Sequence, residues 1–274
     1  MVKGEQRRKQ LARQKYERQA RRRAETRQKT KRRNVIIASV LAVVVAAGAT
    51  AYATAGLVGA DNKNDAKASA ADRPKDPCAA PAKGEPSKKQ WKKEPKLTVD
   101  GSASYTAKLA TTCGDISLKL DAEKAPHTVN SFDFLTRQGY FDHSPCHRLV
   151  DSDLHVLQCG DPTGTGQGTP GYTIPDENLK DPRLKGGVYP AGTVAMANRY
   201  DGRSEKTRNT GGSQFFLVFQ DSKLPANYTP FGTITQGMDV LKKIAKAGYT
   251  TDPQTQNTAP NATVVIDRAR ITKS

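Results

Sequence analysis

The chain has 274 residues and a formal net charge of +17, and its length allows one large domain or two small ones. An evenly spread charge of this size would indicate a nucleic-acid-binding protein. The charge is not evenly spread, because residues 1–33 hold 15 Lys and Arg against 3 Glu, whereas residues 97–274 hold 19 basic against 18 acidic groups. The basic character therefore belongs to an N-terminal arm, residues 1–34.

This arm is polar and strongly basic, as expected of a tail that fixes membrane topology and contacts anionic lipid. Contact with nucleic acid or the ribosome is the alternative. The arm contains one aromatic residue, Tyr16, so it offers no platform on which bases could stack. We expect anionic lipid as its partner and no nucleic acid.

Residues 35–60 form a stretch of 26 residues without a formal charge. As a helix this stretch is about 39 Å long and can cross a hydrocarbon core of about 30 Å. Arg and Lys precede it and Asp61 follows, so the positive-inside rule places the N-terminus in the cytoplasm and the rest outside. A cleaved signal peptide is the alternative, because residues 51–53 (Ala-Tyr-Ala) offer cleavage-like spacing, but the preceding charged region is long for one. We expect a single-pass anchor in the cell membrane.

Residues 61–96 combine five prolines with Lys, Ala, Asp and Ser, a composition typical of a linker. All four cysteines lie beyond the predicted span. Outside the cytoplasm an even cysteine count favours disulfides, and four cysteines allow three pairings.

Residues 97–274 show mostly the patterns of β-structure. Alternating apolar residues predict strands at 105–111 and 116–120 with a turn between them. Pro126, followed by apolar residues at helical spacing, predicts a helix that ends near Gly139. Many short strands with two helices indicate a mainly β fold, a closed barrel capped at its ends. The second helix is predicted at 238–248, and further short strands at 146–150, 155–160, 192–198, 213–219, 231–235 and 263–271.

General catalytic motifs such as G-x-S-x-G, a P-loop or HExxH do not occur. A zinc site could be drawn from His143, His147, His155 and a thiolate. Against it, Cys146 and His147 are adjacent on a predicted strand, so their side chains point to opposite faces. We expect no metal and no cofactor.

The segments CHRLV (146–150) and VLQCGDPTGTG (156–166) resemble the cyclophilin signature, in which an Arg on one strand and a Gln on the next face the same groove. AMAN (195–198), NTGGSQFF (209–216) and PFGTI (230–234) resemble the remaining groove segments, in the same order. Together with the arm, anchor, linker and cysteines, the chain resembles the membrane-anchored cyclophilins of actinobacteria.

This resemblance implies an eight-stranded antiparallel barrel with a helix at each end and a substrate groove on one outer face, formed by residues 97–274. It also implies a peptidyl-prolyl cis/trans isomerase that acts on X-Pro bonds of extracytoplasmic proteins and assists their folding, with proline-containing polypeptides as partners. Such a reaction breaks no bond, so it requires no nucleophile, base or metal.

The residues that match the family's groove receive roles from the same resemblance. Arg148 would donate a hydrogen bond to the amide nitrogen of the twisted X-Pro bond, which gains a lone pair only in the transition state. Phe216, Val156 and Leu224 would surround the proline ring. The implied catalytic set is Arg148, Gln158 and Phe216, and the implied substrate-binding set is His155, Val156, Ala197, Asn198, Gln214, Leu224 and Tyr228.

The chain departs from the family pattern at several of these positions. His155 and Val156 stand where an aromatic residue and a Met are usual, Lys223 where Trp is frequent, and Tyr228 where His is frequent. The proline pocket should therefore work with altered walls. Two other function classes remain open: a proline-peptide binding module or chaperone with little turnover, and a redox or metal protein built on the Cys and His cluster.

The groove also predicts a disulfide pairing. If Arg148 and Gln158 flank one groove, CHRLV and VLQCG are antiparallel neighbours, which brings Cys146 and Cys159 to cross-strand distance. The remaining pair is then Cys78 with Cys113.

Overall fold

The structure is a computed structural model, and it describes residues 76–200 and 202–274. The predicted arm (1–34) and anchor (35–60) lie outside these residues. Within the two described ranges, no helix combines the length and the apolar character that a membrane crossing requires.

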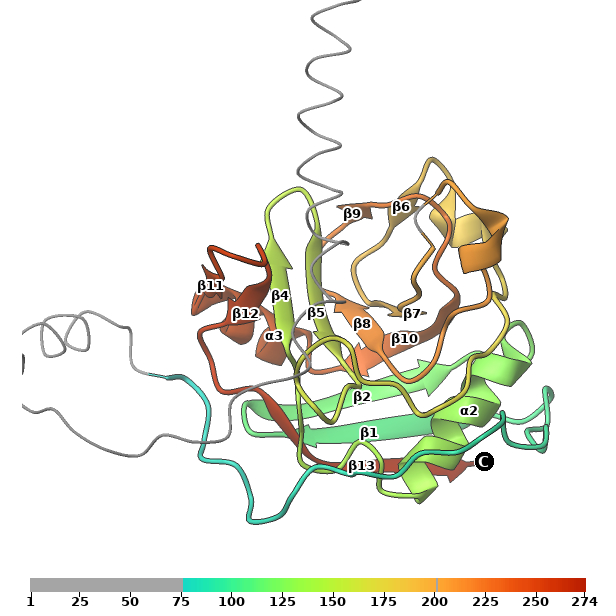
Figure 1. The fold of residues 1–274 in the computed structure, drawn as a ribbon, viewed down its shortest axis with the longest axis horizontal. Coiled ribbons are helices and arrows are strands. Elements are labelled where there is room, and N and C mark those ends of the chain that lie inside the picture. The colour runs from blue at the N-terminus through green and yellow to red at the C-terminus, as the bar shows by residue number, and fades with distance from the viewer. Residues whose placement is uncertain (1–75, 201) are drawn as a thin grey trace, which may run out of the picture. The chain divides into compact units, whose positions relative to one another are not determined.

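The described residues form one large antiparallel sheet with the strand order β3-β13-β1-β2-β10-β7-β8-β5-β4 (Figure 1). The predicted hairpin is present, since Tyr105 pairs with Leu120 and Thr111 with Gly114. In chain order the strands are β1 (Tyr105–Thr111), β2 (Gly114–Leu120), β3 (Ser144–Pro145), β4 (Arg148–Asp151), β5 (His155–Cys159), β7 (Thr193–Met196), β8 (Phe215–Val218), β10 (Pro230–Gln236) and β13 (Val265–Lys273).

The closed eight-stranded barrel needs a correction. The described sheet has nine strands, and its ladder does not join the two end strands, β3 and β4. These two strands are consecutive in the chain, separated only by Cys146 and His147, and they pair with β13 and β5 respectively. Between the two strands, Cys146 N–H donates to the carbonyl of Val264, the residue before β13. The sheet is therefore curled, and its hydrogen-bond ladder stays open between β3 and β4 in the described part of the chain.

Two α-helices accompany the sheet in the described part, as predicted. Helix α2 (Pro126–Arg137) has its proline in the first turn and buries Val129, Phe132 and Leu135, while Gly139 follows with φ +66°. Helix α3 is Met238–Lys246. Helix α2 packs against β13 and α3 against β2. Smaller elements are β6 (Val188–Tyr189) paired with β9 (Ser222–Lys223), β11 (Tyr249–Thr251) paired with β12 (Thr258–Pro260), and the 3-10 turns η1 (Pro182–Leu184) and η2 (Glu205–Thr207).

The buried apolar side chains form two clusters on the two faces of the sheet. The inner core contains a group of aromatic rings, with Phe132 centred 5.0 Å from Phe141 and 5.4 Å from Phe215. A smaller outer cluster contains Val156, Phe216 and their neighbours. Because successive strand residues face opposite sides, β8 supplies Phe215 to the inner core and Phe216 to the outer cluster.

The linker predicted at 61–96 is not a free spacer where the structure describes it. Residues 76–98, which we call the strap, run along the domain surface (Figure 1). Ala82 N–H donates to Asp267 Oδ1 at 2.9 Å, and Trp91 packs edge-on against Phe134, with ring centroids 5.0 Å apart. A few contacts thus anchor residues 76–96 to the domain, although their composition is that of a linker.

Both predicted cysteine pairs are disulfides in the structure. Cys78 joins the strap to Cys113 at the β1–β2 turn, and Cys146 joins Cys159 across 13 positions of sequence. All four cysteines are therefore paired, which removes the thiolate that the alternative zinc site required. Among the described residues, no group of three or more His, Cys, Asp or Glu side chains is arranged to hold a metal ion.

Candidate active site

Four neighbouring strands bring a row of side chains onto the outer face of the sheet. Arg148 on β4 pairs with Gln158 on β5. Gln158 in turn pairs with Phe216 on β8, and Phe216 with Ala195 on β7. Directly opposed residues in antiparallel strands place their side chains on the same face. The register thus assembles the whole predicted catalytic set, which is spread over 69 positions of sequence.

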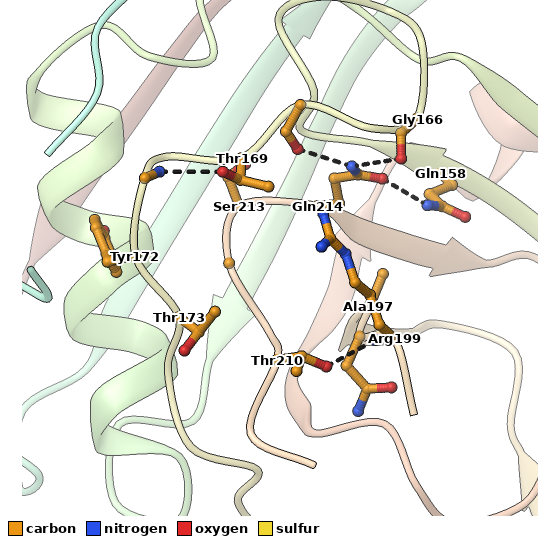
Figure 2. A pocket seen from close by; sticks show the side chains of 14 residues that line it. Gln158, Gly166, Thr169, Tyr172, Thr173, Ala197, Arg199, Thr210, Ser213 and Gln214 are labelled. Atoms are coloured by element: carbon orange, nitrogen blue, oxygen red, sulfur yellow. Dashed lines mark hydrogen bonds between the residues drawn. The ribbon is translucent and has the colours of Figure 1, made fainter. Parts of the chain in front are cut away.

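A chain of polar contacts begins at the arginine. Arg148 Nη1 donates to Gln158 Oε1 at 3.4 Å, and Gln158 Nε2 donates to Gln214 Oε1 at 2.9 Å. Gln214 Nε2 donates to the carbonyls of Gly166 and Gly168, at 3.0 and 2.9 Å (Figure 2). Each amide thus has a fixed orientation, which holds its neighbour in place.

Arg148 is only partly exposed. Burial lowers the pKa of its guanidinium, against a smaller opposing effect of Tyr228, but arginine stays charged in proteins. No carboxylate forms an ion pair with Arg148 in the described part of the chain. The neutral side-chain amide of Gln158 therefore orients the guanidinium. The positive charge remains available to a hydrogen-bond acceptor that enters the groove.

An apolar patch lies beside the arginine. Phe216 is 5 % exposed and meets Tyr228 edge-on, with centroids 5.5 Å apart. Val156 belongs to the same outer cluster, and Leu224 and Ala197 pack against it. Burial raises the pKa of the Tyr228 hydroxyl, although the nearby Arg148 charge opposes that shift. The structure thus brings together five of the predicted residues as an apolar surface next to a cation.

The Asn198 side chain is already committed to internal bonds. Its Nδ2 donates to Asp176 Oδ1 at 3.1 Å and to the Asn227 carbonyl at 2.7 Å, and its Oδ1 accepts from Tyr200 N–H. These bonds tie together three loops at the rim of the groove. The side chain therefore shapes the rim and has no amide N–H left for a substrate.

His155 does not join the groove. It precedes Val156 on β5, and adjacent strand residues face opposite sides. Its Nδ1 lies 2.6 Å from Asp151 Oδ1, and its Nε2 lies 3.2 Å from Gln220 Nε2. Lys223, in β9, is exposed.

A cavity of about 380 Å³ adjoins the row (Figure 2). Gln158 and Gln214 form one side of it. The rest comes mainly from two loops: a glycine-rich one (Asp161–Tyr172), to which the sequence analysis gave no site residue, and the one between β7 and β8, in which it named Ala197, Asn198 and Gln214. The sequence signal was the density of glycines, of which Gly164, Gly166 and Gly171 have φ between +69° and +91°, a conformation that favours glycine. The lining residues are Gln158, Gly166, Gly168, Thr169, Gly171, Tyr172, Thr173, Ala197, Asn198, Arg199, Thr210, Gly212, Ser213 and Gln214.

A curled antiparallel sheet with this row on its outer face is the arrangement of a cyclophilin. The family model described as cyclophilin type peptidyl-prolyl cis-trans isomerase/CLD matches residues 106–271, and the chain belongs to this family.

Individual relatives agree with this assignment. The chain is 50% identical over 155 residues to the "Probable peptidyl-prolyl cis-trans isomerase B" of Mycobacterium leprae, a match that covers 53% of this chain and 50% of that protein. It is 36% identical over 169 residues to the "Peptidyl-prolyl cis-trans isomerase-like 1" of Gibberella zeae, covering 60% of this chain and 96% of that protein. The chain spans about half the length of the mycobacterial relatives it matches.

Solved structures show the same fold. A crystal structure of a cyclophilin type peptidyl-prolyl cis-trans isomerase from Cryptosporidium parvum aligns with a TM-score of 0.50 and 27% sequence identity. The alignment covers 62% of this chain and 99% of that one.

Proposed function

We propose that this protein is a peptidyl-prolyl cis/trans isomerase. The observation that carries the proposal is the cross-strand row in which the charged Arg148 stands one strand away from Gln158 and two strands away from Phe216. Family membership supports it. The row supplies the two features that rotation about an X-Pro bond needs: an apolar seat for the proline ring and a fixed donor for the twisting amide.

The chemistry explains why these two features suffice. An X-Pro amide must lose its resonance to rotate, over a barrier of about 18–20 kcal/mol. As the bond twists, the amide nitrogen becomes pyramidal and gains a lone pair. A donor that reaches this lone pair binds the transition state better than either planar form, and only such differential binding accelerates the reaction. Arg148 would fill this role, because partial burial strengthens the electrostatic interactions of its guanidinium and the hydrogen bond to Gln158 fixes its direction.

The ring of the substrate proline would lie on the outer apolar cluster. Phe216, Val156 and Leu224 present carbon surface there, and the Tyr228 ring stands against Phe216. This surface would hold the proline ring fixed while the residues before the X-Pro bond rotate relative to it. Gln214 and the adjoining cavity would receive the substrate residues that precede the proline.

We further propose that the enzyme acts outside the cytoplasm on proline-containing segments of folding proteins, as a single-pass membrane protein whose basic arm contacts anionic lipid. The warrant is in the sequence: the +12 arm precedes an uncharged stretch of 26 residues. The two disulfides support this setting, because such bonds persist in oxidising compartments.

A protease-coupled assay of X-Pro isomerisation with the full-length protein tests the activity. Acceleration of the cis-to-trans step establishes the enzyme. Saturable peptide binding without acceleration would instead make the groove a binding module for proline-containing segments.

A further inference from the structure

The strap meets the glycine-rich loop at Trp91. The Trp91 backbone N–H donates to the Pro170 carbonyl at 2.8 Å. Gly171, the next loop residue, lies so close that a Cβ there would come within 2.5 Å of the Trp91 carbonyl oxygen. The indole is wedged against Phe134 on α2 and against Tyr140, with ring centroids 5.0 and 5.9 Å away. The ring thus fixes the strap to the core, and the strap backbone holds the end of the loop.

The same loop holds the polar side of the groove. The carbonyls of Gly166 and Gly168 accept both hydrogen bonds of the Gln214 amide nitrogen. Gln214 Oε1 accepts from Gln158, whose own oxygen accepts from Arg148. A displacement of the loop would therefore remove the acceptors that orient Gln214, and the orientation of the next two side chains depends on Gln214.

A loop of this composition needs an external anchor. It has four glycines between positions 161 and 172, and glycine loses more conformational freedom on ordering than other residues do. At its start, buried Asp161 accepts from Thr163 and from Gly168 N–H. At its far end Pro170 is held by Trp91. The loop is thus fixed near both ends, by the hydrogen bonds of Asp161 at its start and by the strap backbone at Pro170.

We propose that Trp91 is a positioning residue of the isomerase site. It keeps the strap against the glycine-rich loop, and the loop in turn keeps Gln214, Gln158 and Arg148 in their working orientation. This inference rests on the proposed isomerase activity and adds to the site a segment that precedes residues 106–271, the range matched by the family model. The anchor acts on the side of the groove that faces the cavity of about 380 Å³.

The test compares three strap variants of the full-length protein. Trp91→Ala removes the ring that seats the strap, and Trp91→Phe retains an aromatic ring against Phe134 and Tyr140. Lys89→Ala is the matched control, because Lys89 lies on the same strap and its Nζ donates to the Gln138 carbonyl after α2. For each, one measures kcat and KM on an X-Pro peptide, thermal unfolding, and the NMR resonances of the Gln214 side-chain amide.

The proposal expects Trp91→Ala to lower kcat/KM about tenfold at equal folded concentration, mainly through kcat. The Gln214 amide resonances should shift or broaden in the same variant. Trp91→Phe should retain most of the wild-type kcat/KM and nearly wild-type Gln214 resonances, and Lys89→Ala should match wild type in both measurements. A ring that served stability alone would change the unfolding temperature and leave Gln214 and kcat as they are, and that result would overturn the proposal.

A second variant decides the matter if Trp91→Ala does not fold. Gly171→Ala places a methyl group within 2.5 Å of the Trp91 carbonyl oxygen, at a φ of +91° that is strained for alanine, and leaves the indole in the core. It should produce the same Gln214 change and the same loss in kcat. A folded Gly171→Ala protein with wild-type Gln214 resonances would contradict the proposal. If wild type itself shows no isomerisation, the proposed function fails, while the Gln214 resonances still test whether Trp91 positions the loop.

Discussion

Phe215 and Phe216 are neighbours on β8 whose rings lie on opposite faces of the sheet. Phe215 is fully buried in the inner core and meets Phe132 edge-on at 5.4 Å, whereas Phe216 lies in the outer cluster against Tyr228. Strand β8 therefore contributes one phenylalanine to the inner core and the next one to the outer cluster beside the groove.

Paired substitutions at these positions should separate folding from activity. Phe215→Ala should cost about 3–5 kcal/mol of unfolding free energy, as for a core phenylalanine, and should keep most of the activity per folded molecule. Phe216→Ala should lower kcat/KM at least about tenfold, since contacts worth about 1.5–3 kcal/mol are lost. Denaturant unfolding and a protease-coupled assay measure the two effects. Full activity in the Phe216 variant would remove it from the proline pocket.

The Cys146–Cys159 disulfide should contribute to stability rather than to chemistry. Both side chains belong to the inner core, while Arg148 and Gln158 face the groove. Replacing both cysteines with alanine should reduce the unfolding free energy by about 3 kcal/mol in the chain-entropy model. The folded double variant should retain its kcat. The double alanine variant of Cys78 and Cys113 is the matched control for loss of a disulfide away from the groove.

Asp181 should make stability depend on pH in the acid range. Hydrogen bonds from Arg183 lower the pKa of this buried carboxylate from 3.8 to about 2. A carboxylate with a lowered folded-state pKa stabilises the fold above its unfolded pKa and loses that contribution as pH falls through the folded value. Between pH 4 and pH 2 the wild type should lose about 2 kcal/mol from this group.

Two variants check the assignment of this pH dependence. Asp181→Asn should flatten the fall in unfolding free energy between pH 4 and pH 2, and Arg183→Ala should flatten it in part. Denaturant melts at several pH values give the slopes. An Asp181→Asn protein with the wild-type slope would show that another group is responsible.

The proposed topology gives a further expectation. Protease added to intact spheroplasts should degrade the C-terminal domain, because residues 61–274 are proposed to lie outside. A cytoplasmic protein serves as the control for membrane integrity. Protection of the domain until lysis would contradict the orientation.

Local patterns were sufficient to predict the hairpin at 105–120, helix α2 and most strand positions. The pairing of Arg148 with Gln158 followed from the family motif, and it carried the Cys146–Cys159 pairing with it. Strand alternation left open whether Phe215 or Phe216 faces inward, because both are phenylalanine. The ladder resolves this by placing Phe216 opposite Gln158.

The misses have physical reasons. His155 was expected in the groove together with Val156, although strand periodicity alone separates adjacent side chains onto opposite faces. The strap up to residue 96 has the composition of a linker, because one indole and a disulfide, rather than a run of apolar residues, attach it to the domain. The partners of Trp91, Phe134 and Tyr140, are more than 40 positions away in sequence, and contacts at that range leave no local pattern.

The most direct test of the mechanism is the rate of cis/trans exchange at an X-Pro peptide, measured by NMR line shape with wild type and Arg148→Ala at equal folded concentration. Arg268→Ala, an exposed arginine on β13, is the matched control and should behave as wild type. A donor aimed at charge that develops in the transition state is worth about 2.7–4 kcal/mol. Arg148→Ala should therefore slow catalysed exchange at least about a hundredfold, and equal exchange rates in the two proteins would contradict the role given to Arg148.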